Sequence, residues 1–333
     1  MILAGDVGGT KVNLALCEVS GQRVRAEFQK RYSSLQFSGL KQILETYLSE
    51  TGVSQKDISA VCLGVPGPIV EGKCQTVNLP WKIEEPQVTE IFPQAKAKLL
   101  NDLEAMAYGL SALSIGDGLH VLRDGPFVNA TRGLIAPGTG LGEAVLFWDG
   151  DGHAISASEG GHCDFGPQDE EQIELLKWLW TRHKHASWEH VASGPAIDRL
   201  YRFLVETGRE SPASDLADEL SGPGVDPSPI IAGYALKGKH AICVRTMDLW
   251  MFCLGAEAGN LALKVMCHGG IFIGGGVVPH ILDLFKRPAF FDGFGSKGRM
   301  SEVIKPMPIY AVTDQHAGLY GAAIAGNTLT HGL

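Results

Sequence analysis

Apolar and polar residues follow two different periods along the chain, and the first change of pattern comes close to its start. A short apolar run covers residues 2–4, and apolar and polar residues then roughly alternate from Val12 to Val19. Both patterns are typical of β-strands. The stretch between them contains the pair Gly8-Gly9, which is typical of a tight turn. The sequence therefore predicts a β-hairpin over residues 2–19 with these glycines at its tip.

Polar side chains flank this predicted turn on both sides. Asp6 comes just before the glycines, and Thr10 and Lys11 come just after them. Glycine can adopt positive φ, and it lets backbone N–H groups approach an anion closely. A carboxylate, a hydroxyl and a cation around such a turn suit a nucleotide phosphate that carries Mg²⁺. Taken alone, the stretch is equally consistent with an ordinary glycine hairpin.

Two commoner phosphate-binding loops do not fit this stretch. A P-loop has Gly-Lys-Ser/Thr leading into a helix, whereas here Gly9-Thr10-Lys11 is followed by strand periodicity. The dinucleotide-binding fingerprint needs a third glycine that opens a helix, and the sequence lacks one.

A second hairpin of the same kind follows farther along the chain. Apolar residues 133–136 lead to a turn that contains Gly138 and Thr139, and a further apolar run covers residues 143–147. Two such hairpins predict two similar halves, each presenting a phosphate loop to a shared cleft.

Buried apolar runs and helical patterns alternate between the two hairpins, which predicts an α/β fold. Residues 60–65 form an apolar run, and residues 96–100 are predicted to form a short strand that ends at Asn101-Asp102. A helical pattern begins directly after these two polar residues. Because α/β sheets bind ligands at the C-terminal ends of their strands, Asp102 is a candidate site residue. Capping of the helix by Asp102 or Asn101 is the alternative interpretation.

The second half of the chain contains three further candidate regions. Residues 158–165 form a polar loop with two acids and an imidazole, and a metal site is one interpretation. No paired Cys-x-Cys follows Cys163, however, so structural zinc is not expected. Three successive glycines at 274–276 follow a buried apolar run and precede a predicted helix, and they allow a flat ring to lie against the backbone. Glu189 precedes another helix and, taken alone, is typical of a solvated surface side chain.

The remaining elements are predicted from the same periods. Residues 235–267 are expected to form long helices interrupted near Gly255, and residues 76–81 a loop that contains Asn78. The other expectations are helices over 37–49, 171–185, 196–205 and 316–325, strands over 270–273 and 308–312, and an exposed loop over 211–229 with a possible short helix near 216–220.

Composition and charge exclude several classes of protein. The chain has 333 residues, enough for two domains, and 45% hydrophobic and 20% charged residues as in ordinary globular proteins. Its net charge of −9 without a basic run argues against nucleic acid and anionic membranes as partners. The first apolar stretch contains Asp6 and Lys11, so neither a signal peptide nor a membrane span is expected there. Seven scattered cysteines are typical of buried thiols in a reducing compartment, and we expect a cytoplasmic protein.

Together, these motifs resemble those of the bacterial-type glucokinases in the sugar kinase–actin–heat-shock ATPase superfamily. The resemblance rests on five motifs that occur in one order: residues 6–11, Asn101-Asp102, residues 136–144, Glu159-Gly160-Gly161-His162 and Gly274-Gly275-Gly276. It implies two ribonuclease-H-like, actin-like ATPase domains with an interdomain cleft. The domains would be 1–110 plus 303–333, in which the last helix packs on the first domain, and 111–302.

The resemblance also implies ATP-dependent phosphorylation of the 6-hydroxyl of glucose. Asp102 would be the catalytic base, and Asp6 would hold Mg²⁺ through water. The sugar would be bound by Asn101, Asp102, Glu159, His162 and Glu189, with Asn78 as a neighbour. ATP would be bound by Asp6, Gly8, Gly9, Thr10, Lys11, Gly138, Thr139, Gly274, Gly275 and Gly276. The family also implies a homodimer.

Two alternatives from other classes stay open. A sibling repressor–kinase family carries a similar Glu-Gly-Gly-His loop before a cysteine-rich zinc knuckle, which this sequence lacks. A repressor would also need a helix-turn-helix, and the hairpin that starts at residue 2 leaves no room for one at the N-terminus. A non-catalytic sugar sensor would most simply lack the base, whereas Asp102 is present.

Overall fold

The computed structural model describes residues 1–76, 81–126, 128–212 and 215–331. The chain divides into two compact units. Unit 1 contains residues 1–119, 155–157 and 314–333, and unit 2 contains residues 120–154 and 158–313. Asn78 lies outside the described residues.

The central sheet of unit 1 has the strand order β3-β2-β1-β4-β8. β1 (Ile2–Val7), β2 (Lys11–Ser20) and β3 (Arg23–Ser33) are antiparallel neighbours, and β1 and β2 confirm the first predicted hairpin. β4 (Ala60–Val65) and β8 (Lys96–Asn101) run parallel to β1 and confirm the two predicted buried strands. The carboxyl ends of β1, β4 and β8 therefore share one edge of this sheet.

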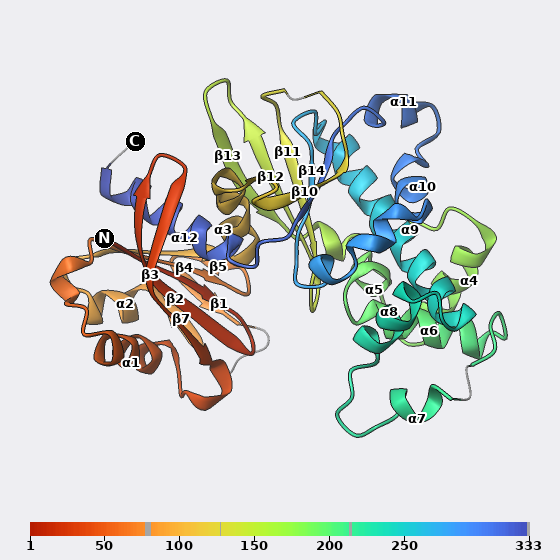
Figure 1. The fold of residues 1–333 in the computed structure, drawn as a ribbon, viewed down its shortest axis with the longest axis horizontal. Helices are drawn as coiled ribbons and strands as arrows, with labels where there is room; N and C mark the ends of the chain where they lie inside the picture. The colour runs from red at the N-terminus through yellow and green to blue at the C-terminus, as the bar shows by residue number, and fades with distance from the viewer. Residues whose placement is uncertain (77–80, 127, 213–214, 332–333) are drawn as a thin grey trace. The chain divides into compact units, whose positions relative to one another are not determined.

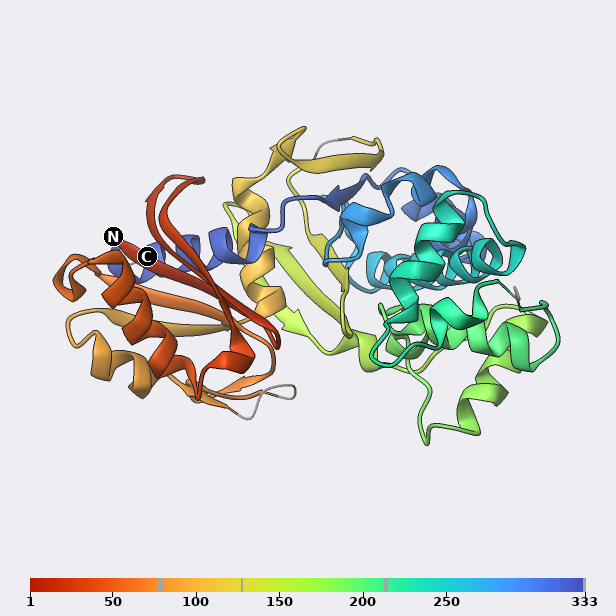
Figure 2. The ribbon, with the colours of Figure 1, turned by 60° about the horizontal axis from the view of Figure 1, so that its bottom comes forward.

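Helices cover both faces of this sheet, because the apolar side chains of β1 alternate between them. Leu3 packs in one cluster with side chains of α1 (Leu40–Thr51) and α2 (Glu85–Ile91). Ile2 and Ala4 pack in another with side chains of α3 (Asp102–Gly109) and α12 (Ala317–His331). Figure 1 shows α12 in blue beside the red and orange elements of unit 1, and Figure 2 agrees.

The C-terminal helix α12 is held tightly against α3. A Cβ added at Gly321 would lie 1.6 Å from the Ala105 carbonyl oxygen, and one added at Gly109 would lie 1.9 Å from the Ala317 carbonyl oxygen. Glycine at both positions thus allows the two backbones to approach closely. The smaller strands are β5 (Ile69–Val70), β6 (Lys73–Gln75) and β7 (Lys82–Glu84), which pair in that order, and β9 (Ser114–Ile115), which pairs with the start of β10 (Gly118–Arg123).

The sheet of unit 2 contains the second predicted hairpin. β11 (Arg132–Pro137) and β12 (Leu141–Trp148) pair antiparallel, which confirms that prediction. β13 (His153–Ser158) lies beyond β12, while β14 (Ile271–Ile273) and β15 (Ile309–Val312) run parallel to β11 on its other side, followed by β10.

Helices pack beside this sheet around the long helix α9 (Ala241–Val265). Its Trp250 is fully buried, and the indole N–H donates a hydrogen bond to the Ser193 carbonyl oxygen at 2.7 Å. The other helices of unit 2 are α4 (Glu170–Trp180), α5 (Glu189–Ala192), α6 (Ala196–Glu206), α7 (Ala217–Leu220), α8 (Pro227–Leu236), α10 (Ala289–Gly295) and α11 (Ser301–Ile304).

Three predictions about the helices of unit 2 were wrong. Gly255 does not interrupt a helix but lies inside α9, where a Cβ would be 2.0 Å from the Phe290 carbonyl oxygen of α10. Glycine at this position therefore allows α9 and α10 to pack closely and does not break the helix. A 3₁₀ turn, Val278–His280, follows the glycines 274–276 in place of the expected α-helix. The helix predicted over 171–185 also ends earlier, at Trp180.

The structure bears on two expectations drawn from composition. In the described ranges, no helix combines the length and apolar character that crossing a membrane requires. The cysteines are buried as expected, except Cys163, which is exposed within the polar loop 158–165 of unit 2.

Candidate active site

The turn between β1 and β2 is closed by its own backbone. The Gly8 N–H donates a hydrogen bond to the Lys11 carbonyl oxygen at 2.7 Å, so Gly9 and Thr10 lie at the tip. Thr10 is exposed, while Gly8, Gly9 and Lys11 are half-buried. An exposed hydroxyl and a turn backbone at one tip form a site that suits a phosphate group.

Asp6 lies below this tip and is held by residues from both ends of unit 1. Its carboxylate accepts a hydrogen bond from the Asn13 side-chain amide at 3.4 Å, because the hairpin register pairs the two residues. A Cβ added at Gly318 of α12 would lie 3.7 Å from the same carboxylate. Burial raises the pKa of Asp6, against the hydrogen bond from Asn13 and the charges of Lys11 and His316. A nearby cation would favour the ionised form.

Asn101 and Asp102 stand at the edge of the sheet that also carries Asp6. Strand register pairs Asp6 with Gly64 of β4, and Val65 of β4 with Asn101 of β8, so the three strand ends lie in sequence along one edge. Ligands bind at such carboxyl edges in α/β sheets. The first phosphate turn and Asp102 are therefore placed on one side of unit 1.

The alternative interpretation, capping of the helix, is correct for Asn101. Asp102 is the first residue of that helix, α3. The Asn101 Oδ1 accepts hydrogen bonds from the N–H groups of Leu103 at 2.9 Å and Glu104 at 3.4 Å, which makes Asn101 the N-cap of α3. Its Nδ2 donates to the Gly67 carbonyl oxygen at 3.3 Å. Asp102 is half-buried, and its Oδ1 accepts from the Leu103 N–H at 2.9 Å.

The second hairpin turn is joined to the glycines 274–276 within unit 2. The Gly274 N–H donates to the Ile135 carbonyl oxygen of β11 at 2.8 Å. Gly275 has a φ of +90°, and a Cβ there would lie 2.3 Å from the Pro137 carbonyl oxygen. Gly276 and Gly138 have no such neighbour, and Thr139 is exposed. The phosphate turn and the predicted adenosine motif thus form one continuous backbone surface.

The glycines of the two phosphate turns correct one expectation. Positive φ was an expected use of Gly8 and Gly9, but neither adopts it, and Gly138 does not adopt it either. Close approach of a ligand to the backbone is the other predicted reason for glycine at these positions.

The three sugar-binding residues predicted in the second half of the chain lie together in unit 2. The His162 Nε2 is 3.8 Å from Glu159 Oε2 and 3.8 Å from Glu189 Oε2. Glu159 and His162 are exposed, and the side chain of Glu189 is 30% exposed. Two carboxylates and an imidazole with free surface can accept from and donate to adjacent hydroxyl groups. Such a set suits a polyol.

Glu189 is held more firmly than Glu159 and His162, because hydrogen bonds at the neighbouring residue of its helix α5 fix that helix. The next residue, His190, is half-buried, and burial lowers its pKa to about 4, with His183 and Arg199 acting in the same direction. The neutral ring accepts from the Ser187 N–H at 3.1 Å. Arg199 donates to the His190 carbonyl oxygen at 2.7 Å.

The described residues contain no group of three or more His, Cys, Asp or Glu side chains that could hold a metal ion. Mg²⁺ differs from zinc in keeping several waters and in binding through one or two carboxylates plus substrate phosphates. A half-buried Asp6 beside an exposed Thr10 hydroxyl fits that kind of site.

Sequence reasoning missed three residues that contact the predicted site. Asn13 could have been found by counting outward from the turn, since residues 6 and 13 face each other in a hairpin closed between 8 and 11. Gly318 and Glu143 could not, because their contacts with Asp6 and Gly160 depend on tertiary folding.

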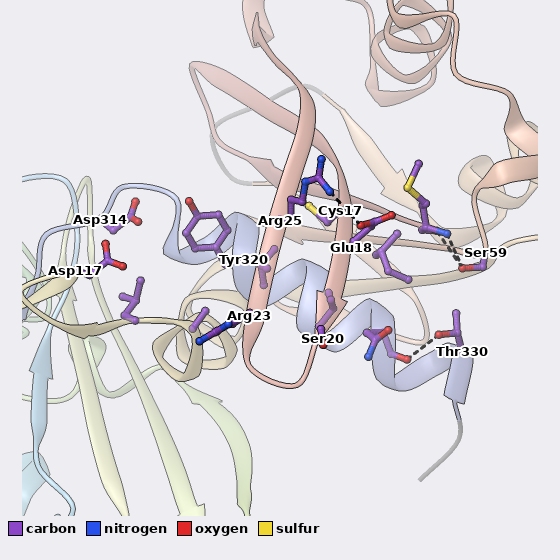
Figure 3. Close-up of a pocket in the computed structure, with 17 residues that line it drawn as sticks. Cys17, Glu18, Ser20, Arg23, Arg25, Ser59, Asp117, Asp314, Tyr320 and Thr330 are labelled. Carbon is purple, nitrogen blue, oxygen red and sulfur yellow. Dashed lines mark hydrogen bonds and ion pairs between the residues drawn. The ribbon is translucent and has the colours of Figure 1, made fainter.

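Unit 1 also contains a hollow of about 890 Å³ away from these residues. Figure 3 shows it between the β2–β3 hairpin and α12, with the labelled side chains of Arg23, Asp117 and Tyr320 on its walls. Among the residues that the structure describes, none of those predicted to bind ATP or sugar lines it.

Comparisons with known proteins agree with this set of motifs. The sequence profile described as Glucokinase matches residues 3–329. A glucokinase of Nostoc punctiforme is 35% identical over 344 aligned positions that cover 99% of both chains. The crystal structure of a glucokinase from an Antarctic psychrotroph has a TM-score of 0.83 at 29% identity and covers 98% of both chains.

A more distant structure shares the fold alone. A ROK family glucokinase from Streptomyces griseus, solved in complex with glucose and AMPPNP, has a TM-score of 0.66 at 20% identity, with 98% of this chain and 99% of that chain covered. The profile and the relatives span nearly all of this sequence, and on that basis the chain belongs to the glucokinase family.

Proposed function

We propose that this protein transfers the γ-phosphoryl group of ATP to the 6-hydroxyl of glucose. The observation that carries the proposal is the position of Asp102 on the same carboxyl edge as the turn at Gly8–Lys11. That edge brings a candidate base and a candidate phosphate turn into one unit. Family membership supplies the substrate class, since the relatives are glucokinases.

A protein catalyses phosphoryl transfer mainly by positioning the reactants and by stabilising the charge on the transferred group. Asp102 would accept the proton of the attacking hydroxyl, for which a half-buried carboxylate at a helix N-terminus is suited. The N–H groups of the turns at Gly8-Gly9 and Gly138-Thr139 would bind phosphate oxygens, with Thr10 and Lys11 beside the first turn. Gly274, Gly275 and Gly276 would lie against the adenosine.

Mg²⁺ bound to ATP would neutralise part of the phosphate charge, with Asp6 as its protein carboxylate, in contact through water. The raised pKa of Asp6 supports this role, because a cation would then compensate for the burial of the carboxylate.

Sugar selectivity would come from Asn101 and Asp102 in unit 1 and from Glu159, His162 and Glu189 in unit 2. A site with buried or oriented polar groups rejects a sugar whose hydroxyl pattern leaves them unpaired. We further propose that the chain forms two ribonuclease-H-like domains, near 1–110 plus 303–333 and near 111–302, and that one glucose contacts both through an interdomain cleft. We also propose that the protein is cytoplasmic and forms a homodimer.

A coupled assay over a panel of hexoses and phosphoryl donors tests the proposal. We expect glucose and ATP to give the highest kcat/KM. Preference for another hexose, together with stoichiometric zinc, would favour the sibling repressor–kinase alternative. Tight glucose binding without turnover would favour the sensor alternative, which the presence of Asp102 argues against.

A further inference from the structure

Two buried glutamates lie beneath the sugar-binding loop of unit 2, and the proposed reaction does not use them. Glu143 on β12 is 2% exposed, and Glu257 on α9 is fully buried. The two carboxyl groups lie close enough to share a hydrogen bond. Buried carboxyl groups are rare unless they are paired with a cation or share a proton.

The donors around this pair all reach Glu257. Lys264 donates to its Oε1 at 3.1 Å, and the Asn260 amide donates to its Oε2 at 2.7 Å. The Glu143 Oε1 is buried, and no described residue donates to it. Because two ionised carboxylates can only accept, the hydrogen bond between them requires a proton on one. Glu257 has the donors that stabilise a negative charge, so the proton belongs on Glu143.

Glu143 also contacts the loop that carries Glu159 and His162. A Cβ added at Gly160 would lie 2.0 Å from the Glu143 Oε2, so the backbone of the loop rests directly on this carboxyl group. The next residue, Gly161, rests in the same way on the Leu141 carbonyl oxygen, which a Cβ would approach to 2.0 Å. The two glycines of the loop therefore fit onto β12, and Glu143 forms part of the surface that supports them.

The titratable groups that face this pair come from three elements. Lys264 of α9 partly offsets the charge of the pair, and Lys297, after α10, donates to the Ala256 carbonyl oxygen at 2.8 Å. The thiol of Cys163 in the loop lies near Lys264. Burial raises the pKa of Glu143 to about 8, with the Glu257 carboxylate as the second cause and Lys264 acting against both.

We propose that Glu143 is a positioning residue for glucose binding, whose protonated carboxyl group, hydrogen-bonded to Glu257, supports Gly160 and so holds Glu159 and His162 in place. The inference rests on the proposed glucose site. Removal of the proton places two like charges side by side in a buried position, which displaces the loop above them. Glucose affinity then falls, while Asp102 and the phosphate turns are not affected.

The experiment compares wild type with Glu143→Gln, because the amide can still donate to Glu257 but cannot ionise. Glucose binding without nucleotide is measured by calorimetry at about pH 7 and about pH 9. If only the protonated form binds well, the Kd of wild type rises up to about tenfold over this range, while that of the variant stays flat. At about pH 7 both proteins have the same kcat at saturating glucose. Glu170→Gln, the same exchange at an exposed position of α4, keeps the rise of wild type.

A second measurement checks the proton directly. The infrared spectrum of wild type at about pH 7 contains a carboxylic acid C=O band that is missing in Glu143→Gln. A missing band in wild type, a pH-independent Kd in wild type, or an equal rise in the variant would each overturn the inference. Absence of glucose binding in both proteins at both pH values would instead overturn the proposed function, and with it the site that Glu143 is inferred to support.

Discussion

The carboxylate of Glu189 accepts a hydrogen bond from the backbone N–H of Leu141 at 3.2 Å. This contact ties the last predicted sugar-binding acid to the first residue of β12, directly after the second phosphate turn. A Cβ added at Gly140 would lie 2.5 Å from the same Oε2, so a glycine is needed for the approach. The predicted sugar-binding acid and the predicted phosphate turn of unit 2 are thus held by one short stretch of backbone.

Two replacements of Glu189 should distinguish the effect of its charge on glucose binding from the effect of its hydrogen bond with Leu141 on stability. We expect Glu189→Gln to weaken glucose binding by about 10-fold or more, because a neutral acceptor replaces a charge-assisted one. The amide oxygen can still accept from Leu141, so the melting temperature should stay within about 2 °C of wild type. Glu189→Ala should lower both affinity and melting temperature. Calorimetry with glucose and thermal unfolding give the two values, and unchanged affinity in both variants would remove Glu189 from the site.

Asp102→Asn should lower kcat by at least about 10²-fold, the usual scale for a lost general base. Because Asn101 rather than Asp102 caps α3, the exchange should leave the stability of the helix intact. Asn101→Ala is the matched comparison: it removes the cap and should cost about 1 kcal/mol of stability. Steady-state kinetics and urea unfolding of both variants make the test. Near-normal turnover of Asp102→Asn would mean that another group takes the proton.

The fold was predictable from sequence where the pattern of apolar and polar residues within a single strand or hairpin was sufficient to identify it. The hairpins at residues 2–19 and 133–147 follow from strand alternation and paired turn glycines, and β4 and β8 from short apolar runs. Gly255 was misjudged because a glycine in a helical pattern has two meanings, a break or a close helix contact. The neighbour that decides between them, Phe290, is distant in sequence.

The candidate site was predictable in its residue types but not in its supports. Asp6, Glu159 and His162 are recognisable because charged or polar residues flank glycines in ordered motifs. In the sequence, Glu143 is the one charged residue at the start of the predicted strand over 143–147, and a charged residue normally faces solvent. Its burial against Glu257 and Gly160 depends on how α9 and the loop pack on β12. No local pattern contains that information.

The two interpretations of Gly255 predict opposite effects of a methyl group. Gly255→Ala should destabilise the protein by about 1–3 kcal/mol, because the added Cβ would meet the Phe290 carbonyl oxygen at 2.0 Å. Gly233→Ala in α8 is the control, since a Cβ there meets no atom within 4 Å. It should be neutral or stabilise by about 0.5–1 kcal/mol. Urea unfolding of both variants measures the difference, and equal effects would argue against the close contact of α9 and α10.

The metal requirement of the activity is the next prediction, because the described residues contain no group of three or more side chains that could hold a metal ion. We expect activity to require added Mg²⁺ and to survive a zinc-selective chelator. Asp6→Asn should raise the Mg²⁺ concentration needed for half-maximal rate, because the carboxylate is the main candidate for contact with the hydrated ion. Kinetic titration with Mg²⁺ and elemental analysis of pure protein are the measurements. Zinc at one equivalent per chain would contradict this expectation.

The proton on Glu143 should also be visible in the stability of the protein. The unfolded chain loses the proton of this residue near the ordinary glutamate pKa of about 4.3, whereas the folded chain keeps it up to about 8. The folded state therefore binds more protons over this window, and the free energy of unfolding falls as pH rises, by up to about 1.4 kcal/mol per pH unit. Glu143→Gln removes this contribution. Its stability relative to wild type should rise from about pH 5 to about pH 8.

Urea unfolding of the two proteins at several pH values below 8 makes the comparison. Values above pH 8 are avoided because burial lowers the pKa of Lys297 to about 8. Above that pH, this group makes the free energy of unfolding rise with pH, opposite to the effect of Glu143. Tryptophan fluorescence is a suitable probe, since the only tryptophan of the sequence outside unit 2 is Trp81. A stability difference that stays constant from about pH 5 to about pH 8 would show that Glu143 is ionised in the folded protein, because the difference depends on pH only if the folded state keeps the proton above the ordinary glutamate pKa.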